Sequence, residues 1–450
     1  MPRRSLRGFG KKSEEEILRG LDFLRQHRGR FPIGQALPIA HSIERRLREL
    51  GCVQKVQVAG SILRRKETVG DADILVVSED AARVMDFFTS MPEVAHVYGK
   101  APTKSSVRLA MGMDADLRVV PRESFGAALN YFTGSKAHNV HLRRIALDRG
   151  LKLNEYGLFK GEKAIAGRTE QELYQALGLP FIVPELREDR GEIEAAQEGR
   201  LPNVIGYGDL KGDLQTQTDW SDGKHSIEGM AFEAKKVGLE YIAITDHTAS
   251  LAMMGMDETK LARQIEVIRR VDRKLSGIRI LAGAEVNVMP DGSLDVSDSL
   301  LSKLDVVGVA IHSHFHQSRE QMTERICRAM RNPHVDVLFH PTGRVLQKRE
   351  PYDLDLHEVL RVARQTGTAL EIDAIPDRLD LKDEHVRMAV DAGVKLVIDS
   401  DAHATAHFGY LHYGVAQARR GWATAGDVLN TLPLKRFLAS LKDGRKEKGR

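Results

Sequence analysis

Cysteine is nearly absent from this chain, with Cys52 and Cys327 the only two among 450 residues. They lie far apart and outside any Cys-x-x-Cys pattern, which favours two reduced, small apolar residues over a disulfide. No apolar run is long enough to cross a bilayer, and the basic start lacks a secretory apolar core. We therefore predict a cytoplasmic protein without membrane attachment. Its length predicts more than one domain.

Excess charge is also scarce, at a net +4, but what there is lies at one end. Residues 1–50 carry twelve Lys/Arg against six Asp/Glu, or +6, so the remaining 400 residues carry −2. A basic segment on a near-neutral body predicts contact with a phosphate backbone, although such segments are also often merely solvated. Gly8, Gly10 and Lys11 belong to a segment whose sequence predicts a short glycine turn before a capped helix. This turn resembles a helix-hairpin-helix, which implies DNA-phosphate binding by these residues; a plain loop-to-helix junction is the alternative.

The stretch Gly60-Ser61-Ile62-Leu63-Arg64-Arg65, followed by Gly70-Asp71-Ala72-Asp73, carries the sharpest chemical signal. On a strand, Asp71 and Asp73 point to the same face. Two adjacent carboxylates repel, and a divalent cation such as Mg²⁺ normally holds them together. A small-residue turn with a serine and an arginine beside such a cation is typical of a polyphosphate site. The alternative is a strand whose exposed face happens to carry two acids.

This stretch resembles the palm signature of family X DNA polymerases, the group that includes polymerase beta. The spacing matches without insertion and implies that Gly60, Ser61 and Arg64 bind the nucleotide triphosphate. Leu63 and Arg65 depart from the pattern, which has an arginine and a glycine there. The family's third carboxylate maps to Asp116, in the segment Asp114-Ala115-Asp116-Leu117-Arg118. The resemblance implies that Asp71, Asp73 and Asp116 hold Mg²⁺ or Mn²⁺ for two-metal nucleotidyl transfer.

A second segment, Tyr131-Phe132-Thr133-Gly134-Ser135, resembles the family's thumb motif. It implies that Tyr131, Phe132 and Gly134 line the nucleotide sugar, that Asn139 contacts the base, and that Arg143 touches the template. A buried aromatic pair at the head of a helix is the structural alternative for Tyr131 and Phe132. Bacterial members usually begin with further helix-hairpin-helix segments, so we expect a chain that is truncated or naturally short at its amino end and grips gapped DNA less firmly.

From Gly206 the pattern changes to short apolar runs, each ending in polar residues and followed by a helical segment. Such strand ends are typical of a βα barrel, whose active site lies at the carboxyl ends of its strands. Histidine, aspartate and glutamate together suit Zn²⁺ or Mn²⁺. The seven predicted strand ends are Gln215/Gln217, Asp246-His247, Glu285, His312-Ser313-His314, His340-Pro341, Asp373 and Asp401-Ala402-His403.

These segments resemble the PHP (polymerase and histidinol phosphatase) domain. The resemblance implies a 3′–5′ exonuclease or phosphodiesterase with metals held by Asp222, His247, Glu285, His312, His340, Asp401 and His403. The family's first strand supplies His-x-His, where this chain has Gln215 and Gln217. Neutral amides are poor ligands for zinc or manganese, so we expect doubtful occupancy of the metal position between Glu285 and Asp401 and a weakened nuclease.

We predict a multidomain α/β and α+β protein, with a nucleotidyltransferase-type antiparallel palm and helical thumb before a seven-stranded βα barrel. Expected palm strands run from Val53 to Ala59, Asp73 to Val77, Ser106 to Met111 and Ala115 to Val120. The domains are 1–50 (a helical fingers remnant), 51–125 (palm), 126–183 (thumb), 184–205 (a charged linker) and 206–450 (PHP barrel).

Three functions stay open. The first is a DNA polymerase that fills short gaps in repair, acting on gapped or primer-template DNA and dNTPs as a monomer. The second is a metallo-phosphoesterase or 3′–5′ exonuclease in which the barrel does the main chemistry. The third is a non-catalytic DNA-binding scaffold, favoured by Leu63, Gln215 and Gln217 and opposed by the intact acids Asp71, Asp73 and Asp116.

Overall fold

A computed structural model describes residues 29–250 and 254–441, and the chain divides there into two compact units. The first ends at Gly199 and the second begins at Arg200, with the short segment Leu346–Arg349 grouped with the first. The glycine turn predicted at Gly8 and Gly10 lies outside the described residues. Within the described part, no helix is long and apolar enough to span a bilayer.

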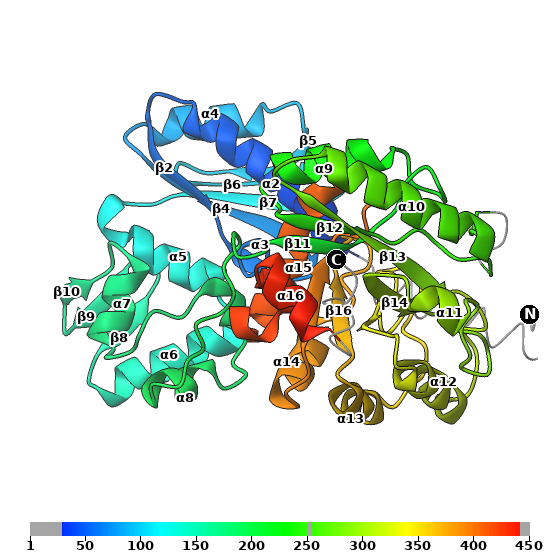
Figure 1. Cartoon of the computed structure of the whole chain (residues 1–450). Coiled ribbons are helices and arrows are strands. Elements are labelled where there is room, and N and C mark those ends of the chain that lie inside the picture. The colour runs from blue at the N-terminus through cyan, green and yellow to red at the C-terminus, as the bar shows by residue number, and fades with distance from the viewer. Residues whose placement is uncertain (1–28, 251–253, 442–450) are drawn as a thin grey trace, which may run out of the picture. The chain divides into compact units, whose positions relative to one another are not determined.

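A five-stranded sheet, the palm sheet, is the centre of the first unit in its described part (Figure 1). Its strand order is β2-β4-β7-β6-β5. The helices α2 and α4 cover it, and α2 buries residues spaced three or four apart, including Ile33, Leu37 and Ala40, as a one-sided helix must. The first elements are β1 (Phe31–Pro32), α2 (Ile33–Arg48), β2 (Val53–Val58), α3 (Gly60–Leu63), β3 (Thr68–Val69), β4 (Asp71–Ser78), α4 (Ala81–Thr89), β5 (Val94–Lys100), β6 (Lys104–Leu109) and β7 (Asp114–Val119).

The palm sheet is mixed, so the prediction of an antiparallel palm is wrong at one pair: β4 and β7 run parallel. The reason is the helix α4, which follows β4 and carries the chain back along the sheet. The chain therefore enters β5 in the same direction as it ran in β4. Two reversals follow, the second at the predicted turn at Gly112, whose φ of +90° suits glycine. The edge strand β5 was not predicted, because nearly all of its side chains are exposed and give no alternation.

The remaining residues of the first unit mix helices with short strands, as predicted for the thumb. The helix α5 packs its Phe125 and Ala128 against Leu75 and Val77 of β4. These elements are α5 (Phe125–Thr133), α6 (Lys136–Asp148), β8 (Lys152–Asn154), β9 (Gly157–Lys160), β10 (Lys163–Ala166), α7 (Glu170–Ala176) and α8 (Glu192–Gln197).

Residues 184–197 do not form the linker that their charge suggests. Arg187 and Glu192 are fully buried, and α8 belongs to the first unit. The Arg187 guanidinium pairs with Glu170, and Glu192 accepts a 2.6 Å hydrogen bond from Nδ1 of the buried His138. Charged residues are buried when they are paired, so composition alone mistakes this segment for a solvated one. The boundary lies after Gly199 instead.

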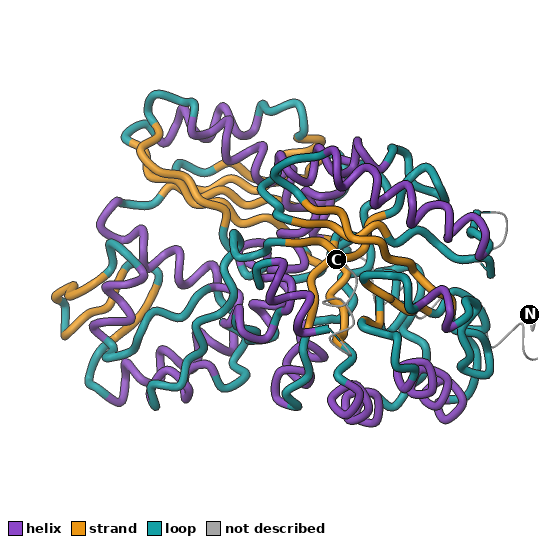
Figure 2. The backbone as a smooth tube through the Cα atoms, viewed as in Figure 1, coloured by secondary structure: helices purple, strands orange, loops and turns teal. Residues whose placement is uncertain are grey.

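The second unit is the predicted barrel. Over its described residues, seven parallel strands follow one another in sequence order, and Thr216 pairs with Ala402 to bring the last strand against the first. Figure 2 shows these strands in orange with helices in purple around them. The strands are buried on both faces; all five residues of β14 are, as expected for a parallel sheet covered by helices. The strands are β11 (Gly212–Thr216), β12 (Tyr241–Ile244), β13 (Arg279–Asn287), β14 (Val306–Ala310), β15 (Val337–Leu338), β16 (Ala369–Asp373) and β17 (Leu396–Asp399).

Amphipathic helices lie outside these strands (Figure 1) and complete the core with their apolar faces. The last helix, α16, differs, because its Phe437 stacks on Tyr241 in a separate buried cluster with Leu214 and Ala243. Side chains cap the starts of four of the outer helices, α9, α10, α12 and α13; Ser318, for example, forms a reciprocal capping box with Gln321 at the start of α12. The helices are α9 (Ile227–Lys236), α10 (Glu258–Lys274), α11 (Asp298–Leu301), α12 (Arg319–Arg331), α13 (Leu356–Thr366), α14 (Asp383–Asp391), α15 (Leu411–Arg420) and α16 (Leu434–Ser440).

Candidate functional site

The parallel pair β4–β7 brings the palm acids together. Asp71 lies opposite Asp114, and Asp73 lies opposite Asp116, in an unbroken register. Because alternate residues share a face, the acids stand at one end of a strand face whose other end, Leu75 and Val77, packs against α5. The register therefore sets a row of carboxylates beside the thumb helix.

Crowding of these carboxylates raises their proton affinity. Burial, then the neighbouring charges of Asp71 and Asp116, raise the pKa of Asp73 to about 7. Burial and the charges of Asp116 and Asp114 likewise raise the pKa of Asp71. A divalent cation relieves this repulsion, so the donor set fits Mg²⁺ or Mn²⁺.

Asp116 and Asp114 differ in their partners. Lys104 Nζ lies 3.1 Å from Asp116 Oδ2, and Arg118 lies 3.9 Å from the same atom. Asp114 instead pairs with Arg108 at 3.2 Å. Basic side chains thus hold the carboxylate of Asp116 beside Asp73. The carboxylate of Asp114 is held by Arg108 at the more exposed end of the strand.

The turn at α3 lies directly against the acids. A Cβ on Gly60, whose φ is +63°, would lie 2.5 Å from Asp73 Oδ2, so only glycine allows this approach. Ala59 donates its backbone N–H to the carbonyl of Asp73 at 2.8 Å. The predicted Gly60-Ser61 turn therefore borders the acids as the sequence indicates.

Arg64 caps α3 and is already engaged. Its Nε donates to Glu188 Oε1 at 3.0 Å, and its Nη1 donates to the carbonyl of Thr133. Arg64 and Glu188 each keep roughly an eighth of their side-chain surface exposed. Glu188, which no motif singled out, is thus a close neighbour of the predicted triphosphate arginine.

The thumb residues lie at the junction of α5 and α6. Tyr131 and Phe132 meet edge to face at 5.1 Å, and Tyr131 keeps 37% of its surface exposed, so the pair is not a buried core pair. Asn139 donates its side-chain amide to the carbonyl of Tyr131 at 2.6 Å. Gly134 ends α5 with a φ of +67°, and the half-buried Arg143 lies farther along α6.

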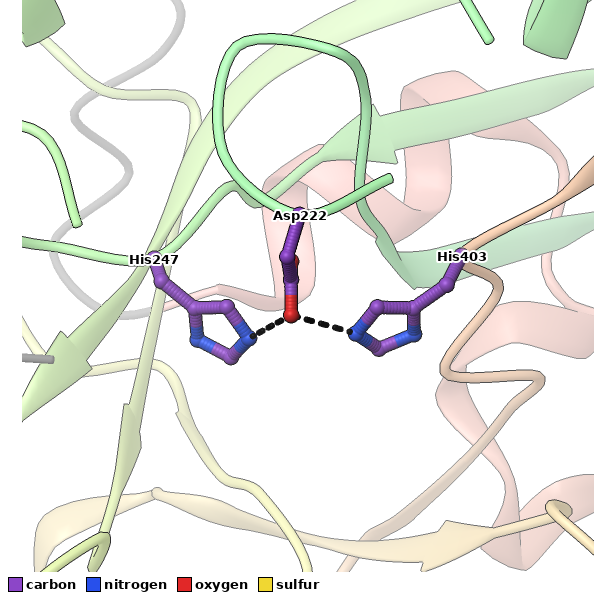
Figure 3. A group of neighbouring side chains, drawn as sticks. All are labelled: Asp222, His247 and His403. Carbon is purple, nitrogen blue, oxygen red and sulfur yellow. Dashed lines mark ion pairs between the residues drawn. The ribbon is translucent and has the colours of Figure 1, made fainter. Parts of the chain in front are cut away.

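In the barrel, Asp222, His247 and His403 converge although they come from three separate loops (Figure 3). Asp222 Oδ2 lies 3.5 Å from His247 Nε2 and 3.2 Å from His403 Nε2. Burial alone would lower the pKa of each imidazole, but the surrounding carboxylates raise it, to about 9 for His247 and about 10 for His403. Protons thus supply the charge that a cation would supply, and one oxygen with two nitrogens fits Zn²⁺ or Mn²⁺.

Glu285, fully buried, is the centre of a second group with His247 and His312. Its Oε1 lies 2.9 Å from His312 Nε2 and 2.8 Å from His340 Nε2. Burial opposes ionisation, but His247 and the two hydrogen-bonded imidazoles lower the pKa of Glu285 well below its usual range. Glu285, His312 and His340 therefore also suit a transition-metal ion.

The third expected metal position lacks the imidazole ligands that suit zinc or manganese. Gln215 and Gln217 each donate an amide N–H to Glu285 Oε2 at 3.0 Å. Asp401, the position's other acid, has Arg378 Nε 4.0 Å from its Oδ2, and the same nitrogen lies 3.4 Å from Asp373 Oδ2. A guanidinium and two amide donors thus approach the carboxylates at this position, and the oxygens left without a hydrogen-bond partner among the described residues include Oε1 of Gln215, Oε1 of Gln217 and Oδ1 of Asp401.

Arg378 was missed by sequence reasoning. It follows β16 in the segment Ile375-Pro376-Asp377-Arg378, which carries no motif and no periodicity. The only available signal was the pair of acids at Asp373 and Asp401, which need a compensating charge when buried.

Comparisons with known proteins match both units. The family model of the DNA polymerase beta thumb matches residues 128–188, and the PHP domain model matches residues 213–374. The DNA polymerase/3′-5′ exonuclease PolX of Bacillus subtilis is 40% identical over 442 residues, which cover 97% of this chain and 77% of that protein. A probable phosphatase of Thermoanaerobacter is 30% identical over 249 residues, covering 53% of this chain and 95% of its own.

Among solved structures, Leishmania infantum polymerase beta in a ternary gap complex aligns with 40% of this chain and 86% of its own, at 20% identity. The TM-score of 0.33 is too low for this alignment to carry an argument. The sequence match over nearly the whole chain is the finding that decides the family.

Proposed function

This chain belongs to the family of the DNA polymerase/3′-5′ exonuclease PolX, and from that premise we propose that it is a DNA-directed DNA polymerase. It fills short gaps during DNA repair, by two-metal nucleotidyl transfer from dNTPs. The observation that carries the proposal is the register of β4 and β7, which sets Asp71 and Asp73 beside Asp114 and Asp116 at the foot of the Gly60 turn.

Asp71, Asp73 and Asp116 hold the Mg²⁺ or Mn²⁺ ions, with Asp116 on the primer side. The ions, when bound, supply the positive charge that two-metal phosphoryl transfer requires. Ser61 and Arg64 neutralise the departing pyrophosphate.

The thumb residues position the base pair. Tyr131, Phe132 and Gly134 line the sugar of the incoming nucleotide, Asn139 contacts its base, and Arg143 touches the template strand. The edge-to-face pair at the exposed end of α5 supports this role, since a buried pair could not reach a nucleotide.

Primer extension on a one-nucleotide-gapped duplex tests the polymerase. Asp71→Ala and Asp116→Ala should abolish the longer product in Mg²⁺ and in Mn²⁺. Asp114→Ala is the matched control, because it lies on the same strand and pairs with Arg108 instead. Extension that survives Asp71→Ala, or that is lost equally in Asp114→Ala, would contradict the assignment.

A second activity has its own support in the barrel, where two groups of ligands remain intact. We propose that this unit is a 3′–5′ exonuclease or phosphodiesterase, weakened by Gln215 and Gln217. Asp222, His247 and His403 would hold one metal, and Glu285 with His312 would hold another. His340, whose Nε2 lies 2.8 Å from Glu285 Oε1, would complete the second group, and these nitrogen and oxygen donors suit Zn²⁺ or Mn²⁺. Such ions supply Lewis acidity for phosphodiester hydrolysis.

Shortening of an end-labelled primer in Mn²⁺ without dNTPs tests the barrel. His247→Ala should abolish it, Asp71→Ala should leave it, and the exposed His357→Ala serves as control. Shortening lost in Asp71→Ala but kept in His247→Ala would place the nuclease in the first unit and contradict the proposal.

The site of action is part of the same proposal. We place the protein in the cytoplasm, because its two cysteines, Cys52 and Cys327, are both free, as in a reducing compartment. We further propose that it binds DNA as a monomer. Size-exclusion chromatography with light scattering tests the monomer.

A further inference from the structure

Arg378 is a cation built into the mouth of the barrel. Its side chain keeps 22% of its surface exposed, while the carboxyl group of Asp373 is fully buried and that of Asp401 nearly so. Arg378 Nε lies 3.4 Å and 4.0 Å from the nearest oxygens of these two acids. A guanidinium does not lose its proton in proteins, so this positive charge is permanent.

At the third metal position, hydrogen-bond donors already surround Glu285. The side-chain amides of Gln215 and Gln217 both donate to Glu285 Oε2, and two imidazole nitrogens approach its Oε1. Amide N–H groups that point at a carboxylate oxygen occupy the lone pairs that a cation would need. The donors of the first strand therefore act on Glu285 in place of a metal.

We propose that Arg378, together with Gln215 and Gln217, replaces one metal ion of the barrel. The guanidinium balances Asp373 and Asp401, the amides satisfy Glu285, and the barrel holds two metal ions rather than three. This inference rests on the metal assignment of the proposed nuclease and deepens it. A guanidinium can stabilise negative charge on a phosphate, but it cannot lower the pKa of water as a metal does, so the replacement keeps charge and gives up nucleophile activation.

One rival occupant is a hard cation bound by oxygen. The side-chain oxygens Oε1 of Gln215, Oε1 of Gln217 and Oδ1 of Asp401 are buried and have no hydrogen-bond partner among the described residues. Mg²⁺ prefers such oxygens, but it would then stand beside the Arg378 guanidinium and share its acids. Two positive charges that share the same carboxylates repel each other, so we favour the arginine as the occupant.

Metal content separates the two occupants. The full chain carrying Asp73→Asn, which disables the palm site, is equilibrated with Zn²⁺, Mn²⁺ or Mg²⁺, desalted, and counted by elemental analysis and native mass spectrometry. We expect two ions per chain, and three after Gln215→His, Gln217→His and Arg378→Ala are combined. The matched control combines Gln365→His with Arg364→Ala, both exposed, and should stay at two. Three ions in the parent chain, or two in the folded combined variant, would overturn the proposal.

Thermal unfolding covers the case in which the combined variant does not fold. Arg378→Met should lower Tm by about 5–10 °C, equally with and without EDTA, because it leaves buried carboxylates unpaired. Arg378→Lys should lose less, because the charge remains. An unchanged Tm in Arg378→Met, or a loss seen only with metal present, would contradict the role.

Neither readout uses DNA or nucleotide, so this inference and the proposed function fail separately. If the chain is an active exonuclease that binds three ions, the metal replacement is wrong and the proposed nuclease function stands. If the chain binds two ions and has no nuclease activity, the replacement stands and the proposed nuclease function is wrong.

Discussion

Arg64 and Glu188 form an ion pair at 3.0 Å, 124 positions apart in the chain, and the carbonyl of Thr133 accepts a further hydrogen bond from the same guanidinium. Lys66 lies 3.9 Å from the other oxygen of Glu188. If Arg64 binds the triphosphate, the phosphate oxygens compete with this carboxylate for the same donors.

Glu188→Gln should therefore tighten nucleotide binding. Removing the competing charge should lower the KM for dNTP about 5-fold with little change in kcat, on the order of 1 kcal/mol for a partly buried pair. Single-nucleotide gap filling over a range of dNTP concentrations measures both constants. The exposed Glu162→Gln is the control. A raised KM would mean instead that Glu188 positions Arg64 for the nucleotide.

Metal binding to the palm should weaken in mild acid. With its pKa raised from 3.8 to about 7, Asp73 carries a proton in the metal-free protein below neutral pH, and Mg²⁺ must displace that proton. We expect Mg²⁺ affinity to rise about tenfold per pH unit below 7 and to level off above it. Isothermal titration in Ala-substituted barrel variants at pH 6 and pH 8 checks this. Equal affinities at the two pH values would rule out Asp73 as the titrating ligand.

The raised pKa of Asp73 also makes the stability of the first unit depend on pH. Asp73 binds its proton more tightly folded than unfolded, so the metal-free first unit should lose stability as pH rises from about 4 to about 7. Asp73→Asn removes this dependence. Urea unfolding across that range compares the two chains, and parallel pH profiles would contradict the shift.

Chelation should make the barrel sensitive to alkali. The pKa values of His247 and His403 are raised to about 9 and about 10, so their stabilising protons are present in full below about pH 6.5 and are lost as pH rises through those values. In EDTA we expect the barrel to lose on the order of 3 kcal/mol between pH 6 and pH 10. With Zn²⁺ bound, the neutral imidazoles are the ligands, and stability should rise with pH from 6 to 8. Differential scanning fluorimetry follows both; the same profile with and without EDTA would argue against metal ligation.

The thumb should depend on Arg187. This fully buried guanidinium pairs with Glu170, and Glu170→Gln would remove the carboxylate that pairs with it directly. We expect a loss of about 3 kcal/mol in urea unfolding of the first unit. The exposed Glu172→Gln on the same helix is the control. A loss below about 1 kcal/mol would show that Arg187 is held mainly by Tyr174 and Phe181, whose rings lie 5.3 Å from it.

Sequence reasoning reached the barrel strands because each ends in a polar tip, such as Glu285 in β13, after a buried run. It placed Asp71 and Asp73 on a strand because alternation is local. It did not reach the parallel pairing of β4 with β7, which depends on the crossover through α4. Nor did it reach Arg378, because a buried ion pair between segments distant in sequence leaves no periodic pattern.

Because side chains of residues 184–197 are buried in the first unit, they limit where the chain can be divided between its two units. A split placed at the compositional boundary near Pro184 would take Arg187, Glu188 and Glu192 away from the unit that they complete. The first unit would then lose the partner of Arg64 along with the carboxylate that accepts a hydrogen bond from His138. A recombination event or protease that separates the halves without such loss acts after Gly199.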